Sequence, residues 1–206
     1  MTLQGFTKED FQVFTIDGLD DRMAAIRGKI QPKFQAIGSE LTMDLSSLLG
    51  DEMYLHIAKH ARRTVNPPKD TWLAIGPNKR GYKQYPHFQL GLFDDHLFIW
   101  LAYIYELPNK AQIAQSFLNQ VEVIKTIIPS DFVISTDHMK KNAQSIKEIS
   151  LEDTLERFKN VKKAEFLIGR NIPANDPILQ NGEALTQLTL DTFKTLIPLY
   201  KLSFTS

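Results

Sequence analysis

Two apolar segments separated by a pair of aspartates constrain the fold of this chain more than any other feature. Residues 87–92 alternate polar or small side chains with apolar ones, as in a strand with one buried face. Residues 96–105 are almost wholly apolar and aromatic, and Asp94-Asp95 between the two segments suits a tight turn. Strands joined by so short a turn pair antiparallel. The sequence therefore predicts a β-hairpin whose second strand is core rather than a cofactor site.

The segments around this hairpin predict an α+β fold. Strands are expected at residues 71–75, 132–135 and 164–168, and helices at residues 20–49, 52–62, 109–127 and 183–200, with one more opened by Ser150 and Asp153. Pro32 and Gly38 are expected to divide or bend the first of these helices. Helices and strands in this order predict an antiparallel sheet of about four to six strands flanked by helices, with residues 1–206 as a single domain.

Composition excludes several classes of protein. The chain has 206 residues, 43% of them hydrophobic, which suits one well-filled core. It has no cysteine, which excludes disulfides, thiolate zinc sites, iron–sulfur clusters and cysteine nucleophiles. The first residues do not resemble a signal peptide, and the longest apolar run is too short to span a bilayer. We therefore expect a soluble, cytoplasmic protein with no membrane partner.

Positive charge is concentrated between His56 and His87. This run has seven lysines and arginines against one acid, Asp70, so it carries a net +6 in a chain whose total is zero. Three of the five histidines lie in the same run. Concentrated positive charge beside imidazole and aromatic groups suits an anionic ligand. The sequence therefore predicts a site for a small anionic or phosphorylated ligand, formed by His56, His60, Arg62, Arg63, Arg80 and His87.

The spacing within this run suggests how the site is assembled. On a helix, His56 and His60 would share one face, but no metal is expected, because Ile57 stands where the zincin motif has its glutamate. Arg62 and Arg63 are either one side of an anion clamp or a solvated helix end. We expect His87 and at least two of the three arginines to border one pocket. The alternative is arginines in scattered surface ion pairs.

Common enzyme motifs are missing. The chain has no GxGxxG, no GxxxxGK[ST] and no GxSxG, and Asp137-His138 is either half of a proton relay or a chance pair. No catalytic residue or cofactor is assigned. Two other functions stay open: a phosphoryl- or adenylyl-transfer enzyme with His60 or His87 as general acid–base, and a module that binds protein or RNA. The zero net charge disfavours a general nucleic-acid binder. No residue pattern indicates an oligomeric state.

Five segments of the chain, in this order, resemble the YktB-like family of uncharacterised bacterial proteins: FTIDGLDDRM, GDEMYLHIAKHARRTVNPPKDTW, KRGYK, PHFQLGLFDDHLFIW and VKKAEFLIG. The resemblance spans Phe6 to about Tyr200. It implies a cytoplasmic, single-domain α+β protein with a topology related to the catalytic domain of biotin ligases and class II aminoacyl-tRNA synthetases. It implies no active site, since fold alone does not imply function and the glycine-rich biotin-ligase signature is absent.

Overall fold

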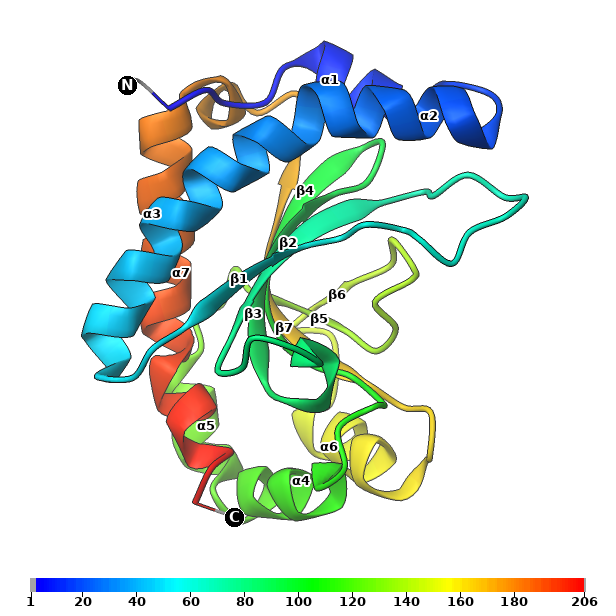
Figure 1. The fold of residues 1–206 in the computed structure, drawn as a ribbon. Helices are drawn as coiled ribbons and strands as arrows, with labels where there is room; N and C mark the ends of the chain where they lie inside the picture. Colours follow the sequence, from blue (N-terminus) through cyan, green and yellow to red (C-terminus); the bar gives the residue numbers. More distant parts are fainter. Residues whose placement is uncertain (1–2, 206) are drawn as a thin grey trace.

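Seven antiparallel strands form one sheet in the computed structural model, which describes residues 3–205 (Figure 1). In spatial order the strands are β1 (Tyr54–Ile57), β2 (Thr71–Gly76), β3 (His87–Leu92), β4 (His96–Tyr103), β7 (Phe166–Pro173), β5 (Val133–Ser135) and β6 (Gln144–Ser145). The predicted α+β class and the β3–β4 hairpin are confirmed. The number of strands exceeds the expected four to six because the sheet also contains β1 and the two-residue β6, at positions where the sequence predicts no strand.

The helices precede, connect and follow these strands. The α-helices are α1 (Lys8–Gln12), α2 (Leu19–Ala25), α3 (Gln31–Leu49), α4 (Lys110–Asn119), α5 (Val121–Ile127), α6 (Leu151–Asn160) and α7 (Gly182–Leu202). Short helical turns are η1 (Val13–Thr15), η2 (Ile26–Ile30), η3 (Tyr82–Gln84) and η4 (Pro177–Gln180). None of the helices within residues 3–205 is long and apolar enough to cross a membrane.

One face of the sheet is covered by α3 and α7, which lie side by side across it (Figure 1). Alternation along β3 and β4 directs Phe88, Leu90, Ile99 and Leu101 to this face, where all four are fully buried. The Phe88 ring lies 4.8 Å from Phe193 and 5.0 Å from Tyr200, both on α7. These contacts form the main hydrophobic core.

The opposite face is covered by connections between strands instead of helices, and we call it the loop face. Its side chains are buried nonetheless, and Phe98 stacks on Trp100 with ring centroids 4.2 Å apart. The residues that cluster there are Ala58, Trp72, Ala74, Phe93, Phe98, Trp100, Ala102, Ile104 and Leu167. Because both faces of β4 are buried, that strand is apolar along nearly its whole length.

The helix predicted at residues 52–62 is wrong. Residues Tyr54–Ile57 form β1, which pairs in register with β2, and the chain then becomes irregular. A four-residue apolar segment fits either state, and its pairing with a neighbouring strand decides between them. His60 has a positive φ of 50°, which no helix contains. His56 and His60 therefore do not share a helix face.

The break expected at Pro32 is confirmed, whereas the break expected at Gly38 is wrong. The irregularity is the π-helical turn η2, and Pro32 follows it in the first turn of α3, where the missing N–H is harmless. Gly38 lies within the continuous α3, and Leu55 of β1 packs against it. A Cβ there would lie 2.6 Å from Leu55 Cδ1, so the glycine permits close approach between helix and strand.

Gly169→Ala is expected to destabilise the protein strongly. Gly169 lies between β4 and β5, and an added Cβ would collide with the backbone carbonyl of Ile99. We expect the free energy of unfolding to fall by about 3 kcal/mol, the upper end of overpacking costs.

The matched control is Gly28→Ala, because nothing lies within 4 Å of a Cβ at that position. It should leave stability unchanged or raise it by up to about 1 kcal/mol through helix propensity. Urea unfolding followed by circular dichroism measures both variants. Equal midpoints for the two would contradict the close packing at Gly169.

Candidate functional site

The first of three neighbouring clefts, which we call the basic cleft, lies beside the connection between β1 and β2. It has a volume of about 380 Å³. Its walls are Ala58, Lys59, His60, Ala61, Arg62, Arg63, Trp72, Tyr82, Lys83, Glu106 and Met139. The loop that carries the first six stays irregular through Asn66-Pro67-Pro68, where the prolines offer no backbone N–H. Arg22 anchors this loop by donating to the Pro68 carbonyl at 2.9 Å.

A second cleft, of about 900 Å³, runs along β1 on the other side of Tyr82, and we call it the β1 cleft. It is lined by Arg27, Gln31, Pro32, Gln35, Leu55, His56, Ile57, Ala58, Lys59, Arg80, Gly81 and Tyr82. Gly81 has a φ of 67°, in the left-handed region that glycine adopts without strain. Tyr82, Ala58 and Lys59 border both clefts and therefore separate them.

The six residues predicted to bind a ligand are divided among three places. His60, Arg62 and Arg63 line the basic cleft, whereas His56 and Arg80 line the β1 cleft. His87 lines neither of these two clefts and is fully buried beneath Tyr82, with ring centroids 4.9 Å apart. Two of the three arginines thus border one cleft, but His87 does not join them.

His87 faces neither a helix end nor solvent and is fully buried. The loop face to which it points is sealed by connections. Its Nδ1 donates to the Tyr85 carbonyl at 2.8 Å, and the Gln89 amide donates to its Nε2, also at 2.8 Å. Burial lowers its pKa to about 3, so the ring is neutral at physiological pH. Both nitrogens are occupied, which gives His87 the contacts of a structural histidine.

His60 lies at the wall of the basic cleft with its ring edge-on to Trp72, 5.5 Å between centroids. Burial, followed by the charges of Arg63 and Lys83, lowers its pKa to about 4. Its Nε2 is 3.2 Å from the Thr71 hydroxyl. A neutral imidazole among cations adds polarity to the cleft without adding charge.

Trp72 forms the floor that connects these groups. Its Nε1 donates to the Tyr82 hydroxyl at 3.0 Å, and the Lys83 ammonium lies 5.7 Å from its ring centroid. Burial raises the pKa of Tyr82 to about 12, which keeps this hydroxyl protonated. Trp72 therefore presents a rigid aromatic surface between the cations and the sheet.

The third cleft contains a buried acid and is called the Asp70 cleft. It has a volume of about 630 Å³ and is lined by Arg22, Arg63, Asn66, Pro67, Lys69, Asp70 and Met139. Arg63 and Met139 also line the basic cleft, so the two adjoin. Asp70 is 1% exposed, and its Oδ2 accepts no hydrogen bond from the described residues. Burial raises its pKa to about 6, against the opposing influence of His138, Arg63 and Lys83.

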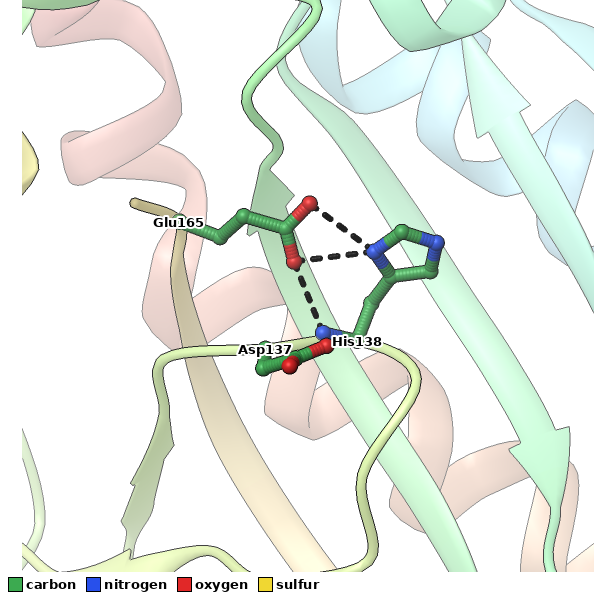
Figure 2. A group of neighbouring side chains, drawn as sticks. All are labelled: Asp137, His138 and Glu165. Carbon is green, nitrogen blue, oxygen red and sulfur yellow. Dashed lines mark hydrogen bonds and ion pairs between the residues drawn. The ribbon is translucent and has the colours of Figure 1, made fainter. Parts of the chain in front are cut away.

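A buried histidine–carboxylate pair lies next to these clefts. Glu165, just before β7, accepts the backbone N–H of His138 at 2.7 Å and faces the His138 Nδ1 with both oxygens, at 2.8 and 2.9 Å (Figure 2). The His138 and Glu165 side chains are 9% and 3% exposed. A carboxylate can only accept, so Nδ1 carries a proton, and in the neutral form of the ring the lone pair is on Nε2.

Residues 137–141 carry this histidine across the loop face. At one end His138 is tied to Glu165, and at the other Lys141 pairs with Asp94 and Asp95 in the β3–β4 turn. Between these anchors the His138 ring meets Trp72 edge-on at 6.2 Å. The segment therefore closes the loop face and brings His138 to the floor of the basic cleft.

Asp137, His138 and Glu165 also have the composition of a metal site, since their ligand atoms lie within 4.8 Å of one another. Each group already has a partner, however. Asp137 accepts the Met139 N–H at 2.9 Å and pairs with Lys140 at 3.2 Å, and Glu165 holds His138. The contacts within the cluster satisfy its charges without an ion.

Sequence reasoning missed Glu165, Glu106 and Met139, and it left Asp137-His138 open as half of a proton relay or a chance pair. The signal for Glu165 was one acid at the start of an apolar strand, in AEFLIG, where a buried charge needs a partner. That partner, His138, is 27 residues away in the sequence. Only the pairing of β5 with β7 brings the two together.

Comparison with known proteins gives a family without an assigned activity. Residues 6–200 match a family model described as a domain of unknown function, DUF1054. The chain is similar to UPF0637 proteins from three bacteria. It is 60% identical to that of Shouchella clausii over 206 residues, covering 100% of this chain and 98% of the relative. It is 58% identical to that of Oceanobacillus iheyensis (99% and 98%) and 59% identical to that of Exiguobacterium sibiricum (95% and 96%).

Asp70→Asn should remove a pH-dependent loss of stability. Because the folded-state pKa of Asp70 is raised from 3.8 to about 6, the native state holds its proton where the unfolded chain has lost it. Stability contributed by this group therefore falls as pH rises from about 4 to 6, by up to about 3 kcal/mol for a two-unit shift. The variant should be more stable than the wild type above pH 6.

The lowered pKa values of His60 and His87 act in the opposite direction over the same range, so the informative quantity is the difference between variant and wild type. Denaturant unfolding from pH 4 to 8 measures it. Asp44→Asn, at an exposed position of α3, is the control and should follow the wild-type curve. A difference curve without slope for Asp70→Asn would contradict the buried, unpaired carboxyl.

Proposed function

This chain belongs to the DUF1054 family, a domain of unknown function, and from its site we propose that the basic cleft binds a small anionic or phosphorylated ligand. One observation carries the proposal: Lys59, Arg62 and Arg63 converge on the cleft without an ion-pair partner among residues 3–205. We also propose that the protein is cytoplasmic, as its sequence predicts.

The charges of the cleft support an anion. Arg63 donates to the Asn66 carbonyl at 3.3 Å, which orients the guanidinium without neutralising it. Lys83 is 3.9 Å from Glu106, at the limit of an ion pair, and both are partly exposed. Cations that outnumber the single acid of the cleft, Glu106, repel one another, and an anion with several oxygens relieves this repulsion through bidentate hydrogen bonds.

The size and walls of the cleft support a small molecule. Its volume of about 380 Å³ lies within the range of ligand sites, and Trp72, Tyr82 and the exposed Met139 add apolar surface to the charged wall. These features favour a ligand with an anionic group and an apolar or planar part. The topology implied by the family resemblance stays a prediction and supports no particular ligand.

A protein- or RNA-binding module is the competing proposal. In such a module the same cations would form a flat binding surface. Its affinity for an acidic protein or for RNA would fall steeply as the salt concentration rises. The half-buried Arg63, which lines the same cleft as Trp72, favours the small ligand, whereas the exposed Lys59 and Arg62 would serve either proposal. Transfer of a phosphoryl or adenylyl group would require an acid–base group in addition to the cations.

We expect the wild-type protein to bind at least one of inorganic phosphate, AMP, coenzyme A and glucose 6-phosphate in titration calorimetry. Arg62→Ala/Arg63→Ala should weaken that binding at least about tenfold, since each charge-assisted hydrogen bond is worth about 1.5–3 kcal/mol. A ligand at 100 times its dissociation constant should also stabilise the wild type by about 2.7 kcal/mol in unfolding experiments.

The matched control is Arg27→Ala/Arg80→Ala, which removes two cations from the β1 cleft and leaves the total charge equal to that of the test variant. It should bind like the wild type. Equal losses in both double variants would indicate a general charge effect and overturn the site. Retention on an RNA column that falls with salt, with no binding of the four small probes, would favour the interaction module instead.

A further inference from the structure

The His138–Glu165 pair has the geometry of a proton acceptor beside the basic cleft. Glu165 accepts hydrogen bonds from the Nδ1–H and the backbone N–H of His138. The ring can therefore neither rotate nor change tautomer without breaking a buried hydrogen bond. Figure 2 shows the second ring nitrogen, Nε2, directed away from Glu165. This nitrogen has no hydrogen-bond partner in the described part of the chain.

His138 itself lines neither the basic cleft nor the Asp70 cleft, but it adjoins residues that do. Its ring contacts Trp72, the floor of the basic cleft, and the next residue, Met139, lines both clefts. Arg63 also lines both, so an anion held by that guanidinium would lie in a cleft that shares Met139, the residue next to the imidazole, as a wall. A fixed lone pair next to a cationic cleft is the arrangement of a general base with an anionic substrate.

We propose that His138 is the general base of this site, positioned by Glu165, and that the substrate is a phosphate ester whose hydrolysis it catalyses. The inference rests on the proposed anion site. It assigns the proton transfer to His138 instead of His60 or His87, because the nitrogens of His87 are both occupied and the Nε2 of His60 faces the Thr71 hydroxyl.

The reaction step is balanced with water as the only co-reactant. Nε2 of His138 takes a proton from a water molecule, and the water oxygen forms a bond to phosphorus. The bond between phosphorus and the leaving oxygen breaks with its electron pair, and the imidazolium returns its proton to that oxygen. Arg63 and Lys83 balance the charge on the phosphoryl oxygens, while Glu165 stabilises the transient imidazolium.

The test is hydrolysis of p-nitrophenyl phosphate and bis(p-nitrophenyl) phosphate by the full-length protein, with and without EDTA. p-Nitrophenolate leaves as a stable anion, so the assay isolates the step that needs the base. His138→Gln, which keeps a polar side chain without the basic nitrogen, should lower kcat about 100-fold or more. Circular dichroism establishes that each variant is folded.

Glu165→Gln tests the positioning residue. It should lower kcat and move the acid limb of the pH–rate profile to lower pH, because the negative charge that favours imidazolium is lost. A purely structural role for Glu165 would lower the amount of folded enzyme without moving that limb. The matched control is His96→Gln, which breaks a second histidine–carboxylate pair, with Asp95 at 2.7 Å, outside the clefts. It should leave hydrolysis unchanged.

The outcomes separate this inference from the proposed function. If the His138→Gln variant still hydrolyses the esters, His138 is not the general base. If EDTA abolishes hydrolysis and zinc restores it, the reaction depends on a metal and the proposed mechanism is overturned. Calorimetric binding of inorganic phosphate with no hydrolysis of either ester overturns the catalytic step and leaves anion binding in place. If the wild-type protein neither binds the anionic probes nor hydrolyses either ester, the proposed function and the inference are both overturned.

Discussion

The burial of β4 on both faces is the constraint on which the rest of the structure depends. From Leu97 to Tyr103 no residue of this strand is more than 1% exposed. Exposing so much apolar surface would cost about 25 cal/mol for every Å², so both faces must be covered. Helices α3 and α7 cover one of them. The other must be covered by the connections between strands, and these carry the polar residues of the clefts.

Covering a sheet with connections places polar groups in a desolvated environment. Each such group needs a partner or changes its protonation, and the loop face shows both results. His138 pairs with Glu165, and His87 is satisfied by Tyr85 and Gln89. Asp70 has no partner for Oδ2, and its pKa rises to about 6. Arg63 is half-buried beside these groups, so partial desolvation strengthens its contact with an anion, whereas Arg62 is exposed.

The two proposals use different parts of this environment. Anion binding depends on the cations of the β1–β2 connection, which have no acidic partners, whereas the proposed proton transfer depends on the pair formed between β5 and β7. They meet at Trp72 and at the residues shared by the adjoining clefts, Arg63 and Met139. A variant in one part therefore reports on binding or on chemistry separately, which makes the site suitable for dissection by single substitutions.

The sequence by itself determined the elements whose signals are local: the hairpin from the alternation around Asp94-Asp95, the helix opened by Ser150, and the concentration of charge between His56 and His87. It could not distinguish a strand from a helix at residues 54–57, because so short and largely apolar a segment suits both until β2 pairs with it. Only the tertiary structure decided which polar groups meet. His87 is buried beneath Tyr82, and Glu165 reaches His138 across 27 residues, because burial and strand pairing are properties of the assembled sheet.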